Sequence, residues 1–135
     1  MKFAVKHELA GRIRVHMWQK NMTMREADIL AYYHVADLFL CMSEHEGFCV
    51  PLVEAMYFGV PILAYRACAV PDTLGDSGIL LDKKDPMETA MVADRILTDT
   101  SLQRELVARQ RRRQQDFSYG AVRALLESQL REFLK

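Results

Sequence analysis

The sequence predicts an α/β fold: a parallel, Rossmann-like sheet with flanking helices. Three observations lead to this prediction. Short strand-like runs alternate with helix-like segments along the chain. Residues 38–42 are apolar without interruption, as expected for a strand covered on both faces. A helix start marked by Pro51 follows shortly after that run, and parallel sheets place their ligand sites beyond such strand ends.

Alternation and end signals place the individual elements. Thr23 and Glu26 form a capping box for a helix to residue 34, and Gly59 and Pro61 end the helix that Pro51 begins. Strands are expected at residues 12–16, 38–42, 62–65 and 79–81, with a loop at 66–77. The remaining helices are expected at 85–97, where Asp85 is the cap, at about 101–114, and after the capping residue Ser118.

Composition limits the class of protein. A chain of 135 residues supports one domain with one core. Its net charge of zero disfavours nucleic acid as a partner, and the basic run at residues 109–113 is interpreted as a solvated helix face. Three cysteines without CxxC spacing indicate reduced thiols. Without an apolar run long enough to cross a bilayer, a cytoplasmic location is expected.

The most informative segment is the loop between the strand at 38–42 and the next helix. Gly47 permits close approach of a ligand, and the helix that follows directs free N–H groups toward phosphate oxygens. Glu46 and Glu54 can accept hydrogen bonds from hydroxyl groups at either end of such a ligand. A sugar–diphosphate–ribose ligand fits both facts. A glutamate near a helix start is also favoured by the dipole alone, which explains Glu54 equally well.

A metal site is not expected from these residues. His45 stands beside Glu44, but two adjacent side chains do not make a ligand set.

Residues 43–56 and 59–64 together resemble the glutamate-x7-glutamate signature of retaining glycosyltransferases of the GT-B fold, family four (group 1 type). Residues 36–40, 70–81 and 117–119 extend the resemblance, which runs from about residue 12 to the end. It implies two Rossmann-like domains with the active site between them. It also implies transfer of a sugar from a nucleotide diphosphate sugar to an acceptor hydroxyl with retention, without a cofactor or a catalytic metal.

Roles follow from the resemblance position by position. The catalytic acidic residue of the family corresponds to Glu46, whose carboxylate would contact the transferred sugar. Backbone N–H groups of Phe48 and Cys49 would hold the sugar, and Glu54 would bind ribose hydroxyls. The donor-binding residues implied by the family are Gly47, Phe48, Cys49, Val50, Leu52 and Glu54, with Val50 and Leu52 nearest the diphosphate.

Departures from the family pattern are also visible. Cys49 stands where glycine is frequent, Asp72 where glutamate is usual, and Cys68-Ala69 where a Gly-Gly pair is common. The family's Arg/Lys pair and its N-terminal acceptor domain have no counterpart in these residues. Residues 1–135 are therefore expected to be a partial nucleotide-sugar-binding C-terminal domain, inactive alone.

The absent N-terminal domain would bind the acceptor, whether sugar, lipid or another molecule. The resemblance suggests a place in polysaccharide biosynthesis, and it leaves open a peripheral membrane association of the full-length enzyme. Two other interpretations remain. The chain could be a non-catalytic α/β module that binds nucleotide sugars or a partner, or a flavodoxin-like domain with a chance match.

The family's strand order, 3-2-1-4-5-6, makes a final prediction about the sheet. The four expected strands match the third to the sixth, so the central pair is missing. Residues 12–16 should then pair directly beside the strand at 38–42, or that edge should pair with another chain.

Overall fold

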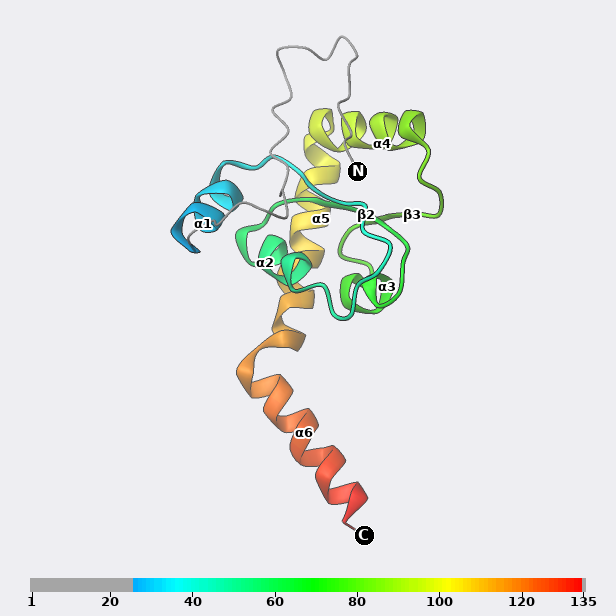
Figure 1. Cartoon of the computed structure of the whole chain (residues 1–135). Helices are drawn as coiled ribbons and strands as arrows, with labels where there is room; N and C mark the ends of the chain where they lie inside the picture. The colour runs from blue at the N-terminus through cyan, green and yellow to red at the C-terminus, as the bar shows by residue number, and fades with distance from the viewer. Residues whose placement is uncertain (1–25, 135) are drawn as a thin grey trace.

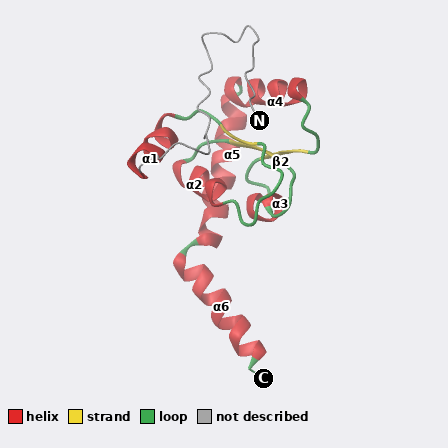
Figure 2. Ribbon diagram, in the orientation of Figure 1, coloured by secondary structure: helices red, strands yellow, loops and turns green. Residues whose placement is uncertain are grey.

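The computed structural model describes residues 26–134, and its centre is a parallel sheet between two helical layers (Figures 1 and 2). Strands β1 (Phe39–Cys41), β2 (Ile62–Tyr65) and β3 (Ile79–Leu81) lie in that order. Both pairings are parallel, with Leu40 opposite Leu63 and Ala64 opposite Leu80. The predicted fold class is therefore confirmed.

Helices connect and cover these strands. Their bounds are α1 (Glu26–Val35), α2 (Val50–Phe58), α3 (Val70–Leu74), α4 (Pro86–Thr98), α5 (Thr100–Arg113), the 3-10 helix η1 (Gln114–Phe117) and α6 (Tyr119–Phe133). Helices α2 and α3 separate successive strands, which is the crossover pattern that a parallel sheet requires.

The two faces of the sheet bury different clusters. Ile62 and Ala64 point into a cluster with residues of α2 and α3, whereas Leu63 packs with residues of α4 and α5. All three are fully buried, because successive side chains of a strand point to opposite faces and both faces are covered. Leu40 in β1 differs, since 47% of its surface is exposed. The expectation that residues 38–42 are covered on both faces therefore fails at this position.

Most predicted helix ends are confirmed. Asp85 accepts the backbone N–H of Glu88 at 2.8 Å, and Ser118 caps α6 in the same way. Gly59 ends α2 with φ of 68°, a left-handed conformation that glycine adopts without steric cost. Helix α2 begins at Val50, one residue before the predicted start, with Cys49 as its cap.

The predicted loop at residues 66–77 is wrong in part, because it contains helix α3. Pro71 lies in the first turn of α3, where its missing N–H has no cost. Gly78 follows in a tight space: a Cβ atom there would lie 2.9 Å from a Leu74 methyl carbon and 3.0 Å from the Ile62 carbonyl oxygen. A helix of five residues is too short for periodicity to predict.

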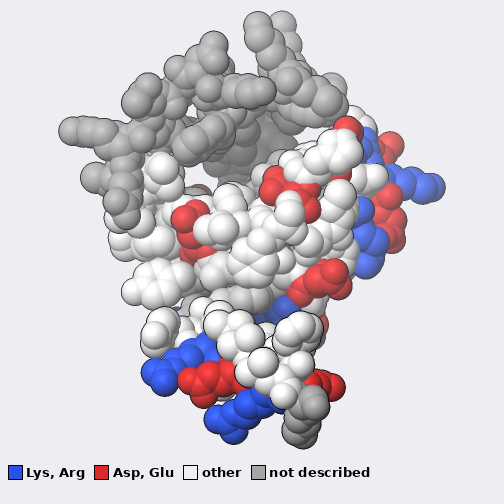
Figure 3. Space-filling model, turned by 60° about the horizontal axis from the view of Figure 1, so that its bottom comes forward, with Lys and Arg blue, Asp and Glu red and all other residues white. Residues whose placement is uncertain are grey.

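The basic run at residues 109–113 is not simply a solvated face. Arg111 and Arg112 are exposed, but Arg113 donates to the backbone oxygens of Asp72 and Thr73. On the face shown in Figure 3, Lys and Arg side chains are interspersed with Asp and Glu and form no continuous positive surface.

Helix α6 extends away from the rest of the described chain (Figure 1). It buries no residue, and apolar side chains such as Leu125 and Phe133 keep 63% and 87% of their surface exposed. Among residues 26–134, no helix has the length and apolar character needed to span a membrane.

The predicted strand at residues 12–16 and the capping residue Thr23 lie outside the described residues. Within the described part, β1 pairs with β2 alone. Whether residues 12–16 join that edge stays a prediction.

Candidate functional site

The loop of residues 42–49 leaves the carboxyl end of β1 and enters α2, as predicted for a ligand site in a parallel sheet. Neighbouring segments hold it in place. The Thr73 hydroxyl donates to the Phe48 carbonyl oxygen at 2.6 Å, and the Ala69 N–H donates to the backbone carbonyl oxygen of Glu46 at 3.5 Å. Lys84 forms an ion pair with Glu44 at 2.8 Å, which holds the pKa of that carboxyl below its usual value. The loop is therefore a fixed surface.

Cys49 turns the chain into α2 with φ of 61° and ψ of 62°. This left-handed conformation costs a residue other than glycine about 1–2 kcal/mol. Its carbonyl oxygen accepts the N–H of Leu52 at 3.0 Å. The N–H groups of Phe48, Cys49 and Val50 have no acceptor among the described residues. Three donors are thus unpaired at the positive end of α2.

Gly47 has an unusual environment for a glycine. A Cβ atom there would meet no atom of the described chain within 4 Å, and its φ is not in the left-handed region. Neither packing nor backbone conformation of residues 26–134 requires a glycine here.

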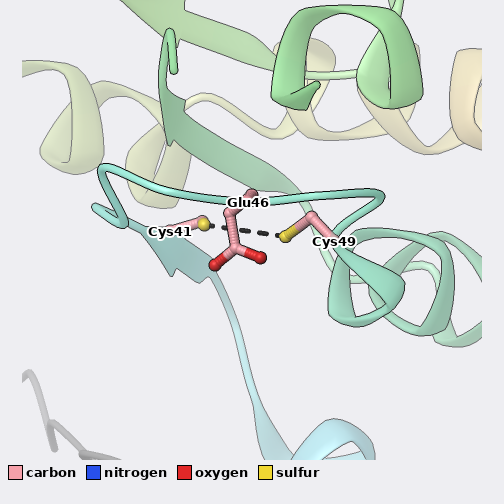
Figure 4. Close-up of side chains that lie close together, drawn as sticks. All are labelled: Cys41, Glu46 and Cys49. Carbon is pink, nitrogen blue, oxygen red and sulfur yellow. Dashed lines mark hydrogen bonds between the residues drawn. The ribbon is translucent and has the colours of Figure 1, made fainter. Parts of the chain in front are cut away.

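Glu46 is half-buried, and its carboxylate lies between the thiols of Cys41 and Cys49 (Figure 4). The two sulfur atoms are 3.9 Å apart and share a hydrogen bond. Each ligand atom of the three side chains lies within 4.8 Å of the others. Burial raises the pKa of the Cys49 thiol to about 12, and the nearby Cys41 and Glu46 act in the same direction. The Cys49 thiol is therefore protonated at neutral pH in the free chain.

Glu54 extends from α2 toward α1. Its Oε2 atom accepts a hydrogen bond from the Tyr33 hydroxyl at 2.9 Å. The Oε1 atom has no partner among the described residues, so half of the carboxylate is available. Burial and the Glu54 carboxylate both raise the pKa of Tyr33, which keeps its hydroxyl as a donor.

Aromatic and cationic side chains of α5 and η1 also support the loop. The Phe48 ring meets Phe117 edge-on, with centroids 5.4 Å apart, and the Arg113 guanidinium lies 4.9 Å from the centre of the Phe117 ring. Arg113 also donates to the Thr73 backbone oxygen at 3.1 Å, and the Thr73 hydroxyl in turn contacts the loop. Helix α5 and η1 thus fix the loop through α3.

The structure gathers most of the predicted site residues in one place. Glu46, Gly47, Phe48, Cys49 and Val50 are consecutive on the loop and its junction with α2. Phe48 and Val50 are half-exposed, with 49% and 55% of their surface accessible, so the site is open. Leu52 contributes a fully buried side chain, and its N–H is engaged with Cys49 in this structure.

Three supporting residues were not predicted: Tyr33, Thr73 and Arg113. Their hydrogen bonds join residues that are 18 to 41 positions apart in the chain: Tyr33 and Thr73 contact the site directly, and Arg113 contacts α3, which holds the loop. No local spacing signals such contacts. For Arg113, the local signal is its position in the last turn of a predicted helix, where basic side chains commonly bind backbone carbonyl groups.

The three thiols should differ sharply in reactivity. Cys68 is exposed, whereas Cys41 and Cys49 expose 8% and 5% of their surface. A pKa raised from 9.0 to about 12 lowers the thiolate fraction of Cys49. A thiolate of higher pKa is also more nucleophilic, which offsets part of this loss. The net effect of the pKa shift is to slow alkylation of Cys49 by about 30-fold. Iodoacetamide followed by peptide mass spectrometry should find Cys68 modified first, and all three cysteines should react in denaturant. Equal rates for Cys49 and Cys68 in the folded chain would contradict this description.

Comparison with known proteins gives a consistent result. Residues 5–113 match the family model described as "Glycosyl transferases group 1". The serotype-specific mannosyltransferase WbdA of Escherichia coli is 30% identical over 97 residues, which are 72% of this chain and 12% of that protein. A D-inositol 3-phosphate glycosyltransferase of Salinispora arenicola is 35% identical over 103 residues, covering 74% of this chain and 23% of the relative.

An N-acetyl-alpha-D-glucosaminyl L-malate synthase of Bacillus anthracis is 37% identical over 87 residues, covering 63% of this chain and 22% of that protein. The chain thus spans less than a quarter of the length of these three relatives. The family model covers most of the sequence, including β1, the loop and α2. The chain belongs to group 1 of the glycosyl transferases.

Proposed function

We propose that this chain supplies the donor-binding part of a retaining glycosyltransferase, which moves a sugar from a nucleotide diphosphate sugar to an acceptor hydroxyl. Glu46 is the catalytic carboxylate that contacts the sugar. The unpaired N–H groups of Phe48, Cys49 and Val50 donate hydrogen bonds to sugar and phosphate oxygens, and the free oxygen of Glu54 accepts hydrogen bonds from ribose hydroxyls. Family membership supports sugar transfer, and the geometry supports this division of roles.

The main support for the proposal is the glycine at position 47. Nothing in residues 26–134 demands glycine there, because a Cβ atom would meet no atom within 4 Å and φ is ordinary. Glycine costs conformational entropy relative to alanine, so an unneeded glycine destabilises the free protein. A ligand that approaches the backbone closely at this point accounts for the residue. The adjacent unpaired N–H groups are where such a ligand would bind.

The acceptor-binding part is proposed to lie outside these residues. The three relatives named above are between four and eight times longer than the segment they share with this chain. Their names differ in the sugar or the acceptor that they state: mannosyl, D-inositol 3-phosphate, and N-acetyl-alpha-D-glucosaminyl with L-malate. We therefore assign this chain a nucleotide sugar as ligand and an α/β donor domain as role. We assign it no particular sugar, base or acceptor.

Gly47→Ala tests the proposal. The variant should fold with an unfolding free energy equal to the parent's or higher by about 0.4–1 kcal/mol, because alanine restricts the unfolded chain. It should also lose affinity for nucleotide diphosphate sugars, because the added methyl group occupies the approach path. Both quantities can be measured on the 15.6 kDa chain, by urea unfolding and by titration of isotope-labelled protein with uridine and guanosine diphosphate sugars.

Gly120→Ala is the matched control. Gly120 also has no atom within 4 Å of a hypothetical Cβ, but it lies in α6. Its replacement should leave ligand affinity unchanged. Parent-like affinity in Gly47→Ala would reject the proposed role of the loop. Absence of any shift around Glu46 in the parent would reject ligand binding by this chain.

The chain alone should not transfer sugar. Transfer requires stabilisation of the negative charge that develops on the departing diphosphate, and for this the loop and the start of α2 offer backbone N–H groups. The site is also exposed to water on the side of Phe48 and Val50. A radiolabelled nucleotide sugar incubated with the purified chain and hydroxyl acceptors should yield no product. Transfer by the 135-residue chain would show that residues 1–135 are a complete enzyme.

A further inference from the structure

Two thiols and one carboxylate converge beside the proposed donor site. Cys41 ends β1, Cys49 caps α2, and Glu46 comes from the loop that joins these elements (Figure 4). The two cysteines are buried, and Glu46 is half-buried, so the cluster reaches solvent on the carboxylate side. We propose that Cys41, Glu46 and Cys49 form a binding site for a thiophilic divalent cation such as Zn²⁺.

The separation of the sulfur atoms fits this proposal. A tetrahedral zinc ion bound at about 2.3 Å by two thiolates places their sulfur atoms about 3.8 Å apart. The observed distance between the Cys41 and Cys49 sulfur atoms is 3.9 Å. A disulfide would require about 2.05 Å and an oxidant. The two thiols are therefore spaced as an edge of a metal tetrahedron.

Glu46 provides the third ligand. Its carboxylate oxygen lies within 4.8 Å of both sulfur atoms, and a movement of about 1 Å brings it to bonding distance of a shared ion. Binding releases one proton from each thiol, because the thiolate is the form that coordinates a metal. Three protein ligands leave one position for water. The two sulfur ligands select Zn²⁺ or Co²⁺ over Mg²⁺, which prefers oxygen.

A bound ion should regulate donor binding at Glu46, a consequence that rests on the proposed function. A cation bound to Glu46 occupies carboxylate lone pairs that would otherwise accept hydrogen bonds from the hydroxyl groups of a donor sugar, and it neutralises the carboxylate charge. Zn²⁺ should therefore weaken nucleotide sugar binding by the chain, and Cys41→Ala should remove this inhibition. If no nucleotide sugar binds with or without Zn²⁺, the proposed function fails. The metal site is then still decided by the measurement below.

Cobalt spectroscopy tests the site directly. Co²⁺ added to the full chain in a non-thiol reductant should produce a thiolate-to-cobalt charge-transfer band and the intense visible bands of a tetrahedral ion. Both should saturate at about one ion per chain. Zn²⁺ should abolish the bands and Mg²⁺ should not. Cys68→Ser is the matched control, because Cys68 is exposed and outside the cluster, and it should give the parent spectrum.

Cys49→Gly is the decisive variant. Glycine suits the left-handed conformation of residue 49, so the fold should survive while one ligand is lost. The charge-transfer band should disappear or weaken strongly in this variant. Cys41→Ala serves as the second variant if Cys49→Gly shows an altered circular dichroism spectrum. Glu46→Gln should reduce the affinity for Co²⁺ by at least roughly 10–100-fold, which is the loss usually caused by removing a residue that only supports a metal ligand. A parent that gives only the spectrum of hydrated Co²⁺, or cysteine variants that bind as well as the parent, would overturn the proposal.

Discussion

Replacement of Glu46 by glutamine, in a full-length protein that carries this segment, is expected to lower the turnover number on the order of 10²-fold. Sugar transfer leaves positive charge on the sugar as the diphosphate departs, and a carboxylate beside the sugar stabilises that charge. Glutamine keeps the shape of the side chain but removes the charge. Affinity for the nucleoside diphosphate should change much less, because Glu46 is proposed to contact the sugar alone.

The measurement separates the two quantities. Turnover comes from steady-state rates at saturating donor, and affinity comes from titration with the nucleoside diphosphate. Glu44→Gln is the matched control, because Glu44 lies on the same loop but is exposed and paired with Lys84. Glutamine keeps a hydrogen-bond acceptor for Lys84, and an exposed ion pair contributes little to stability, so this control should retain turnover. Equal turnover in Glu46→Gln and the parent would reject Glu46 as the catalytic carboxylate.

The strand, loop and helix that hold the candidate site could be predicted because their signals are local. An uninterrupted apolar strand, a glycine-containing loop and a proline at a helix start all lie within residues 38–51, and each follows from backbone sterics or hydrogen bonding. The caps at Asp85 and Ser118 were predictable for the same reason, since a cap needs only a side-chain oxygen and an N–H three residues later.

The remaining features depend on contacts that are distant in the chain. Tyr33 reaches Glu54 because α1 packs on α2, and Arg113 reaches Thr73 because α5 passes α3. The contact between Cys41 and Cys49 depends on the end of β1 and on the left-handed backbone conformation of residue 49. A cysteine in the sequence does not predict that conformation. Helix α3 was missed because five residues cannot display helical periodicity.

The Tyr33 contact bears directly on how Glu54 should be tested. Tyr33 is half-buried and donates to Oε2 of Glu54, so removal of Glu54 also removes a partner within the protein. A loss of nucleotide affinity could then come from displacement of α1. Tyr33→Phe isolates this effect, because it removes only the hydroxyl group. That variant should lower the free energy of unfolding by about 1.5–3 kcal/mol, the usual value for a hydrogen bond to a charged group.

Glu54→Ala should reduce affinity for nucleoside diphosphates by about 1.5–3 kcal/mol, which corresponds to roughly 10–150-fold. The reason is the Oε1 atom, which has no partner among the described residues and is free to accept ribose hydroxyls. Tyr33→Phe should change this affinity far less, because the hydroxyl it removes contacts the other oxygen. Titration of the parent and both variants with a nucleoside diphosphate, alongside urea unfolding of each, distinguishes the two roles. If Glu54→Ala binds as tightly as the parent, Glu54 does not contact ribose. If the two variants lose affinity equally, the Glu54 carboxylate acts through its bond with Tyr33, as an anchor between α1 and α2.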